Sequence, residues 1–258
     1  MDLNLTGKTV LITGGSKGIG LATAKAFATE GANIVIVSRD QEKLDGAAKE
    51  IKNGANVSVE THAADLSQDD AREELFTAYP GVDILVNNAG AIPGGRLEDL
   101  TMDRWRQGWD LKVFGFIHLC KLYLTPMKQR REGTIVNIVG MAGRTCTPDY
   151  ICGAAGNAAL IGFTNALGGE TPSFNVRVFG INPSPTLTDR IITLSKARAK
   201  ASLGDEDRWE EMLDPSRFPF GRLKHASEVG SLAAMLCAPN VHYLSGTVID
   251  MDGGGRWS

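Results

Sequence analysis

Seven short apolar runs, most of them rich in β-branched residues, alternate with longer amphipathic stretches along the chain. The runs are TVLITGG (9–15), NIVIVS (33–38), NVSVETHAAD (56–65), VDILVNNAG (82–90), TIVNIVG (134–140), NVRVFGINP (175–183) and GTVIDMDGG (246–254). Strands separated by helical segments are typical of βαβ units, in which a parallel sheet is buried on both faces. The pattern therefore predicts an α/β fold with seven parallel strands.

The stretches between the strands predict helices near 18–30, 41–52, 67–78, 101–130, 153–169 and 226–238. Thr101 and Ser227 stand where N-caps are expected. No change of composition marks a second domain, so we expect one domain over residues 1–258.

One region, residues 189–222, interrupts the alternation because it is charged and helix-prone and contains no strand. It follows a late strand, at the carboxyl edge of the predicted sheet, where ligands of such sheets bind. We interpret it as a helical lid over the active site. A solvated or subunit-contacting helical excursion is the alternative.

Composition narrows the class of partner. The chain has 258 residues and a net charge of −3, and 43% of its residues are hydrophobic. This charge gives no basic patch for nucleic acid or membrane, so we expect small-molecule partners. The N-terminus lacks the features of a secretion signal and no apolar run has the length of a membrane span, which favours the cytoplasm. The four cysteines are far apart and the histidines lack ligand-like neighbours, so we expect no metal.

A glycine-rich segment, TGGSKGIG (13–20), follows the first strand and opens the first helix. Gly14 permits a tight turn, Gly18 lets the backbone approach a pyrophosphate, and Gly20 lets helix and strand pack closely. The N-terminus of the helix then faces the anion. The candidate cofactor contacts in this loop are Gly14, Ser16, Lys17, Gly18, Ile19 and Gly20.

The spacing of these glycines resembles the short-chain dehydrogenase/reductase family, and further segments agree with it in order. They are ADL (64–66), NNAG (87–90), GTIVNI (133–138), NAALIGFT (157–164), INPSPTLTD (181–189) and IDMDGG (249–254). The resemblance implies a single doubly wound, Rossmann-type domain that binds a nicotinamide dinucleotide and usually assembles as a homotetramer.

The same resemblance implies further cofactor contacts. Asp65 and Leu66 would contact the adenine, and Asn88, Ala89 and Gly90 would border the cofactor. Pro183, Thr186 and Thr188 would hold the nicotinamide end.

The end of the second strand, VSRD, bears on the choice of dinucleotide. A carboxylate there would bind the ribose 2′-hydroxyl of NAD, whereas an arginine suits the 2′-phosphate of NADP. Ser38 and Arg39 stand at this point, and Lys17 could add a second positive charge, so we expect NADP rather than NAD. Asp40 argues the other way, and Arg39 can also be read as a solvated surface residue.

The catalytic positions depart from the family pattern of serine, tyrosine, lysine and asparagine. An alignment without gaps places Gly140 at the serine and Gly153 at the tyrosine, Asn157 at the lysine and Lys112 at the asparagine. One amide and one ammonium are thus retained, with their helices exchanged.

We predict that Lys112 and Tyr150 form a replacement catalytic pair, with Asn157 in a relay or ribose-binding role. A nearby ammonium favours a tyrosinate, and Gly153 leaves room for the Tyr150 ring. Alternatively, Lys112 extends to solvent or pairs with an acid, and Tyr150 is only a wall of the pocket.

The sequence therefore predicts an NADP-preferring oxidoreductase that transfers a hydride between nicotinamide and a carbonyl or secondary alcohol. The rival hypothesis is a dinucleotide-binding protein without turnover, acting as a sensor or a partner subunit.

Overall fold

A seven-stranded parallel sheet with the order β3-β2-β1-β4-β5-β6-β9 lies at the centre of the computed structural model. The structure describes residues 2–255, apart from the side chains at positions 190, 194, 197, 198, 201 and 217. The strands are β1 (Thr9–Thr13), β2 (Asn33–Ser38), β3 (Val59–Ala63), β4 (Ile84–Asn87), β5 (Gly133–Ile138), β6 (Val176–Pro183) and β9 (Val248–Met251). Six of them lie within the predicted runs and β5 begins one residue before its run, which confirms the predicted fold class.

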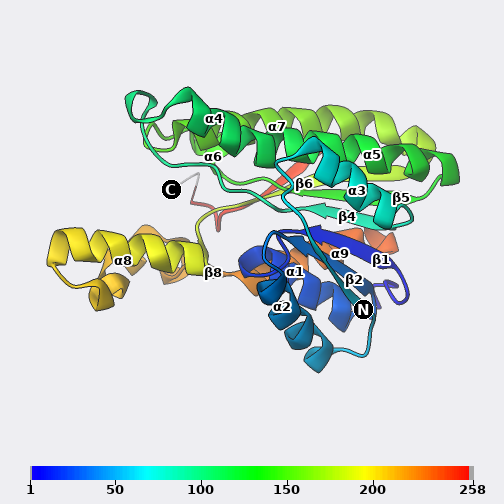
Figure 1. Cartoon of the computed structure of the whole chain (residues 1–258), viewed down its shortest axis with the longest axis horizontal. Coiled ribbons are helices and arrows are strands. Elements are labelled where there is room, and N and C mark those ends of the chain that lie inside the picture. The colour runs from blue at the N-terminus through cyan, green and yellow to red at the C-terminus, as the bar shows by residue number, and fades with distance from the viewer. Residues whose placement is uncertain (1, 256–258) are drawn as a thin grey trace.

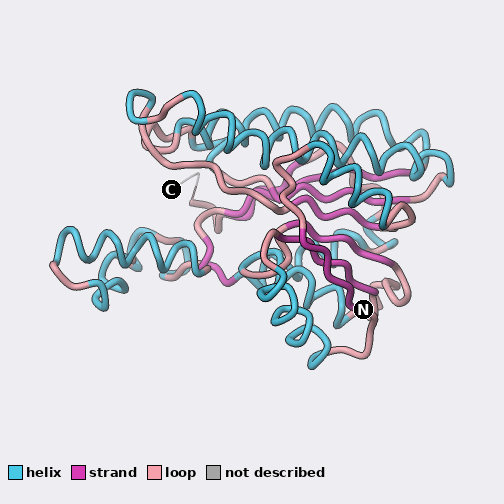
Figure 2. Tube along the Cα trace, in the orientation of Figure 1, coloured by secondary structure: helices cyan, strands magenta, loops and turns pink. Residues whose placement is uncertain are grey.

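Helices cover both faces of the sheet (Figure 1). One layer holds α1 (Gly18–Thr29), α2 (Gln41–Gly54) and α9 (Ala226–Cys237), and the other holds α3 (Asp69–Ala78), α4 (Met102–Trp109), α5 (Gly115–Arg130) and α7 (Ile151–Glu170). Figure 2 shows the strands as one layer between these two layers of helices.

Alternation along each strand supplies the two cores. In β1, Val10 and Ile12 belong to the core on the α1 and α9 side, whereas Leu11 belongs to the core that contains residues of α3 and α5. All three side chains are 0% exposed. Since successive side chains of a strand point to opposite faces, an apolar run of this kind requires cover on both sides.

Helix α7 with the short 3₁₀ turn that follows it, residues 151–174, is long and apolar enough to cross a membrane by length and composition alone. Half of its most apolar window is buried inside the protein, where α7 packs against the sheet. Burial of this kind is that of a core helix in a globular fold.

The long helix expected over 101–130 is interrupted. A π-helical turn, Asp110–Phe114, separates α4 from α5 and contains Lys112. The Arg72 side chain, 1% exposed, donates from Nη1 to the Asp110 carbonyl at 3.3 Å and also to the Leu66 carbonyl. Single π turns inside α-helices occur frequently at functional sites.

The region 189–222 is helical, as expected. It contains α8 (Asp189–Leu203) and 3₁₀ turns at Glu206–Met212, Pro215–Arg217 and Pro219–Gly221. Two short strands, β7 (Thr186–Leu187) and β8 (Lys224–His225), pair in parallel at its base. In Figure 1, α8 projects away from the layered body of the protein. That this region acts as a lid stays a prediction.

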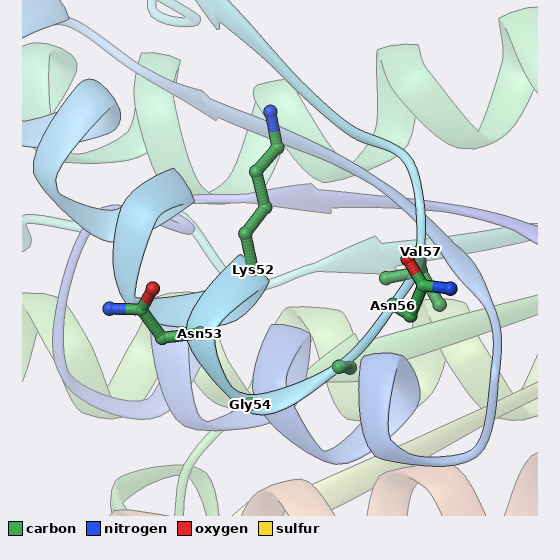
Figure 3. Close-up of a pocket in the computed structure, with 6 residues that line it drawn as sticks. Lys52, Asn53, Gly54, Asn56 and Val57 are labelled. Carbon is green, nitrogen blue, oxygen red and sulfur yellow. The ribbon is translucent and has the colours of Figure 1, made fainter.

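The connection from α2 to β3 forms a shallow surface hollow, lined by Lys52, Asn53, Gly54, Ala55, Asn56 and Val57 (Figure 3). It lies at the amino end of β3, whereas ligands of open α/β sheets bind at the carboxyl ends. We assign it no part of the functional site.

Gly46 offers a test of the helix assignments. It is exposed inside α2, and a Cβ added there meets no atom within 4 Å. Because glycine in a helix interior costs about 0.5–1 kcal/mol relative to alanine, Gly46→Ala should stabilise the protein by about that amount. Urea unfolding followed by circular dichroism measures the change, and a loss of stability would contradict the assignment of α2.

Candidate active site

The glycine loop and the NNAG segment meet where the strand order reverses. β1 lies between β2 and β4, so the loops after β1 and β4 leave the sheet side by side. Asn88 Nδ2 donates to the Thr13 carbonyl at 2.9 Å, and the Asn88 and Ala89 N–H groups donate to Thr13 Oγ1 at 2.9 and 3.0 Å. This is the crevice in which doubly wound sheets bind their ligands.

Thr13 was not singled out by the sequence analysis. The Thr13 residue is 1% exposed. Its hydroxyl oxygen accepts both NNAG hydrogen bonds described above, which fixes the NNAG backbone beside the glycine loop. A polar residue at the end of a buried strand was the signal that could have indicated it.

The glycine loop has the shape that a pyrophosphate requires. Gly14 has a φ of +67° and Gly18 a φ of +56°, and a Cβ at Gly20 would overlap the Gly14 carbonyl oxygen. The N-cap of α1, Lys17, makes no side-chain capping hydrogen bond, and no acidic residue occupies the first turn. The Lys17 side chain is exposed, while Ser16 and Ile19 are half-buried beside it. A helix N-terminus of this kind is suited to an anion.

The end of β2 fits a phosphorylated ribose. The Ser38 hydroxyl is buried and has no hydrogen-bond partner among the described residues, and Arg39 is exposed. The Asp40 carboxylate turns to α2, where it accepts from the Lys43 N–H at 3.1 Å and pairs with Lys43 Nζ at 2.6 Å. The hydrogen bond from the Lys43 side chain lowers the pKa of the Asp40 carboxyl. The negative charge of Asp40, which argued against NADP, is therefore compensated by Lys43.

The two residues predicted at the adenine lie after β3. Asp65 is exposed, and its Oδ1 accepts from the Ser67 N–H at 3.1 Å and from the Ser67 hydroxyl at 2.9 Å. Leu66 is buried, and its carbonyl is held by Arg72. Contact with an adenine stays a prediction for both residues.

The loop predicted at the nicotinamide end closes toward the glycine loop. The Pro183 carbonyl accepts from the Met141 N–H at 3.1 Å, and Thr186 Oγ1 donates to the Ser184 carbonyl at 2.9 Å. The Thr188 Cγ2 atom would lie 3.4 Å from a Cβ at Gly18. The structure thus brings Thr188 and the glycine loop together.

Lys112 points into the protein. Its side chain is 9% exposed, and Nζ donates to the carbonyls of Ile138 at 2.8 Å and Val139 at 3.0 Å. Nζ also lies 4.9 Å from the centroid of the Phe116 ring. The alternative that Lys112 extends to solvent is therefore wrong. Two carbonyl dipoles and an aromatic face stabilise an ammonium at the carboxyl end of β5.

Lys112 also borders the NNAG segment. A Cβ at Gly90 would lie 2.6 Å from Lys112 Cδ and 3.5 Å from Nζ. The missing side chain at Gly90 is what lets the lysine pass from the π turn to the end of β5.

Tyr150 precedes α7, at its N-cap position, with φ −137° and ψ 39°. Its ring occupies the space above Gly153, because a Cβ at Gly153 would overlap the ring atoms Cε1 and Cζ. The expectation that Gly153 leaves room for this ring is confirmed. The apolar cluster around the ring includes Trp105 and Trp109.

Asn157 lies on α7 one turn after Gly153. It is 4% exposed, and Nδ2 donates to the Gly153 carbonyl at 2.7 Å. Its Oδ1 is buried without a hydrogen-bond partner among the described residues and would lie 3.4 Å from a Cβ at Gly140. An unpaired buried acceptor of this kind is costly unless a ligand or water donates to it. It fits a ribose hydroxyl or a relay water.

Asn182 is a second residue that the sequence analysis did not single out. Its side chain is 0% exposed, accepts from the Gly140 N–H at 3.2 Å and donates to Asp250 Oδ1 at 2.8 Å. It holds Gly140, whose φ is +140°, in place at the rim of the site. Its place within INPSP was the available signal.

Within residues 2–255, no group of three or more His, Cys, Asp or Glu side chains is arranged to hold a metal ion.

Comparisons with known proteins agree on the class. The family model for short chain dehydrogenase matches residues 8–199. The chain is 32% identical to the 3-oxoacyl-acyl-carrier-protein reductase FabG of Chlamydia muridarum, over 98% of this chain and 99% of that protein. It is 31% identical to the D-beta-hydroxybutyrate dehydrogenase of Cupriavidus necator, over 97% of this chain and 98% of that protein.

A solved structure, the L-sorbose reductase of Gluconobacter frateurii complexed with NADPH and L-sorbose, superimposes with a TM-score of 0.92 at 30% identity and full coverage of both chains. Fold, glycine loop and sequence relatives lead to one conclusion: the chain belongs to the short-chain dehydrogenase family and is an oxidoreductase of that family.

Proposed function

We propose that the protein is an NADP-preferring oxidoreductase that interconverts a carbonyl and a secondary alcohol, with Lys112, Tyr150 and Asn157 as its catalytic set. The observation that carries this proposal is the buried Lys112 amine at the carboxyl end of β5. A buried ammonium is expensive, and a site for proton transfer is where such a charge is useful.

The three residues have separate roles. Tyr150 donates the proton to the carbonyl oxygen of the substrate. The charge of Lys112 stabilises the tyrosinate, so that the phenol ionises at a pH closer to neutral. Asn157 accepts a hydrogen bond through Oδ1 from a ribose hydroxyl or from a water that relays the proton. The dinucleotide, held by the glycine loop and NNAG, supplies the hydride when it is bound.

NADP is supported by the end of β2. Arg39 is exposed there, Lys17 is exposed in the glycine loop, and Asp40 is engaged with Lys43. The guanidinium of Arg39 suits the 2′-phosphate of NADP. The related L-sorbose reductase was solved with NADPH, which agrees with this choice. NAD is the second cofactor to test.

A second function, dinucleotide binding without turnover, is favoured by one observation: Gly140 and Gly153 carry no side-chain hydroxyl. Titration of the purified protein with NADPH, followed by a screen of carbonyl substrates, separates the two functions. Turnover on any carbonyl supports the oxidoreductase, whereas tight binding without turnover on all of them supports a sensor or partner subunit.

Tyr150→Phe tests the acid directly. We expect kcat to fall by a factor of about 10²–10⁴, the usual loss for a general acid, with little change in the Kd for NADPH. Tyr243→Phe is the matched control because Tyr243 is fully exposed. Gly153→Ala should impair kcat in the same direction, since its methyl group displaces the Tyr150 ring. Full activity in Tyr150→Phe would leave Tyr150 as a pocket wall only.

The remaining parts of the proposal concern setting and assembly. We propose a cytoplasmic homotetramer that acts on a small-molecule substrate and binds neither nucleic acid nor membrane, with residues 189–222 as a lid over the site. Its net charge of −3 supports the absence of a nucleic-acid partner. Size-exclusion chromatography with light scattering measures the assembly.

A further inference from the structure

The two ends of the region 189–222 are joined at one point. Thr186 and Leu187 of β7 pair with Lys224 and His225 of β8. β7 lies in the loop 183–188, which contains the three residues predicted at the nicotinamide end. The geometry of β8 therefore bears on the cofactor loop.

Lys224 adds side-chain bonds to this pairing. Its Nζ donates to Ser184 Oγ at 2.6 Å and to the Ser184 carbonyl at 3.0 Å. The same carbonyl accepts from Thr186 Oγ1 at 2.9 Å. One ammonium and one hydroxyl thus fix the turn at Ser184, just before β7.

The turn at Ser184 is connected to the glycine loop. Two residues after Thr186, Thr188 lies against Gly18, at the N-terminus of α1. A change in the turn at Ser184 would move Thr188 relative to the phosphate-binding loop.

We propose that Lys224 is a positioning residue. Its two hydrogen bonds to Ser184, called the clasp below, hold the loop 183–188 in the conformation that binds the nicotinamide end of the dinucleotide. This inference rests on the proposed cofactor but not on turnover. It concerns a lysine to which neither the family resemblance nor the sequence pattern assigned a role.

The surroundings of Lys224 make the clasp dependent on pH. Lys224 lines a hollow together with Ser184, Phe218, Glu228 and Asp252. Desolvation by burial lowers its pKa from 10.5 to about 8, against the opposing charges of Glu228 and Asp252.

The carboxylate of Glu228 near Lys224 ionises far below this range. Glu228 is paired with Arg222 at 2.7 Å, and the hydrogen bond from Arg222 lowers the pKa of the Glu228 carboxyl to about 2. His225, the next residue along β8, is exposed. Lys224 is thus a group at this loop whose pKa, lowered by burial to about 8, brings its change of charge close to neutral pH.

The sign follows from the protonated form. Below a pH of about 8 the ammonium is charged and makes charge-assisted bonds to Ser184, which are stronger than those of a neutral amine. Above it the amine is neutral and the clasp weakens. Affinity for NADPH should therefore fall as pH rises through about 8.

The test compares Lys224→Met, Lys224→Arg and the exposed control Lys49→Met with the native chain. At pH 7, Lys224→Met should weaken NADPH binding about tenfold, the loss expected when a charge-assisted hydrogen bond is removed. Its affinity should then vary little between pH 7 and 9.5. Lys224→Arg keeps a charge that does not titrate, so its affinity should also lack the step near pH 8. NADPH fluorescence measures Kd at each pH.

Hydrogen exchange of residues 183–188, without cofactor and at matched pH, gives an independent readout. Faster exchange there in Lys224→Met, but not in Lys49→Met, supports the clasp even if the protein turns over no carbonyl. Unchanged exchange in Lys224→Met overturns the inference. So does a step near pH 8 that persists in both Lys224 variants, or a lower melting temperature with an unchanged Kd.

Discussion

Lys112→Met should lower kcat for carbonyl reduction by a factor of about 10²–10⁴, which is the contribution expected of general acid catalysis. The methionine keeps the length of the side chain but removes the charge that favours the Tyr150 phenolate. It also removes the donor that binds the carbonyls of Ile138 and Val139. Proton donation by Tyr150 is then impaired. Because the glycine loop is unchanged, the Kd for NADPH should change little.

The pH profile separates chemistry from folding in this variant. If the ammonium lowers the pKa of the phenol, the pH at which kcat titrates should move upward in Lys112→Met, because an opposite charge near an acid favours its ionised form. Circular dichroism and thermal melting monitor the folded state, since two buried carbonyls lose a donor. Unchanged rates in both Lys112→Met and Tyr150→Phe would discard the catalytic pair.

Gly20→Ala should weaken NADPH binding about tenfold to a hundredfold, because overpacking typically costs about 1–3 kcal/mol. A Cβ at Gly20 would overlap the Gly14 carbonyl oxygen and lie 2.6 Å from Asn88 Nδ2. Both atoms belong to the segments that form the dinucleotide crevice, so the loop must move to accept a single methyl group. Isothermal titration calorimetry with NADPH measures the loss.

Gly46→Ala is the matched control for this experiment, because it adds the same methyl group to a helix where nothing lies within 4 Å. It should bind NADPH as the native protein does. Equal affinity of Gly20→Ala and Gly46→Ala would show that the close packing of Gly20 against Gly14 and Asn88 is not needed for dinucleotide binding.

The sheet was predictable because its signal is local. In the run NIVIVS the four central residues, 34–37, are all apolar and β-branched, which is typical of a strand covered on both faces, and the run forms β2. The glycine loop was predictable for a related reason. Gly14 and Gly18 have positive φ angles, which other residues rarely adopt, so the presence of glycine at these positions itself indicates the backbone conformation.

The directions in which the polar side chains point could not be predicted from the sequence. The sequence left open whether Lys112 points to solvent, because this depends on a π turn and on the free space at Gly90. It left Asp40 as an argument against NADP, because the pairing of that residue with Lys43 depends on where α2 begins. Lys224 and Ser184 are 40 residues apart, and no local pattern connects them.

The π turn at Asp110–Phe114 has a consequence for how this protein can vary. In such a turn each hydrogen bond spans one more residue than in an α-helix, which shifts the phase between α4 and α5 by about 100°. Trp105 and Trp109 of α4 therefore pack on the side of Tyr150, while Leu119 and Tyr123 of α5 pack in the core against the sheet. The positions beside Tyr150 and the positions in the sheet core thus lie on different phases of one helix, so a substitution in α4 need not disturb the packing of α5.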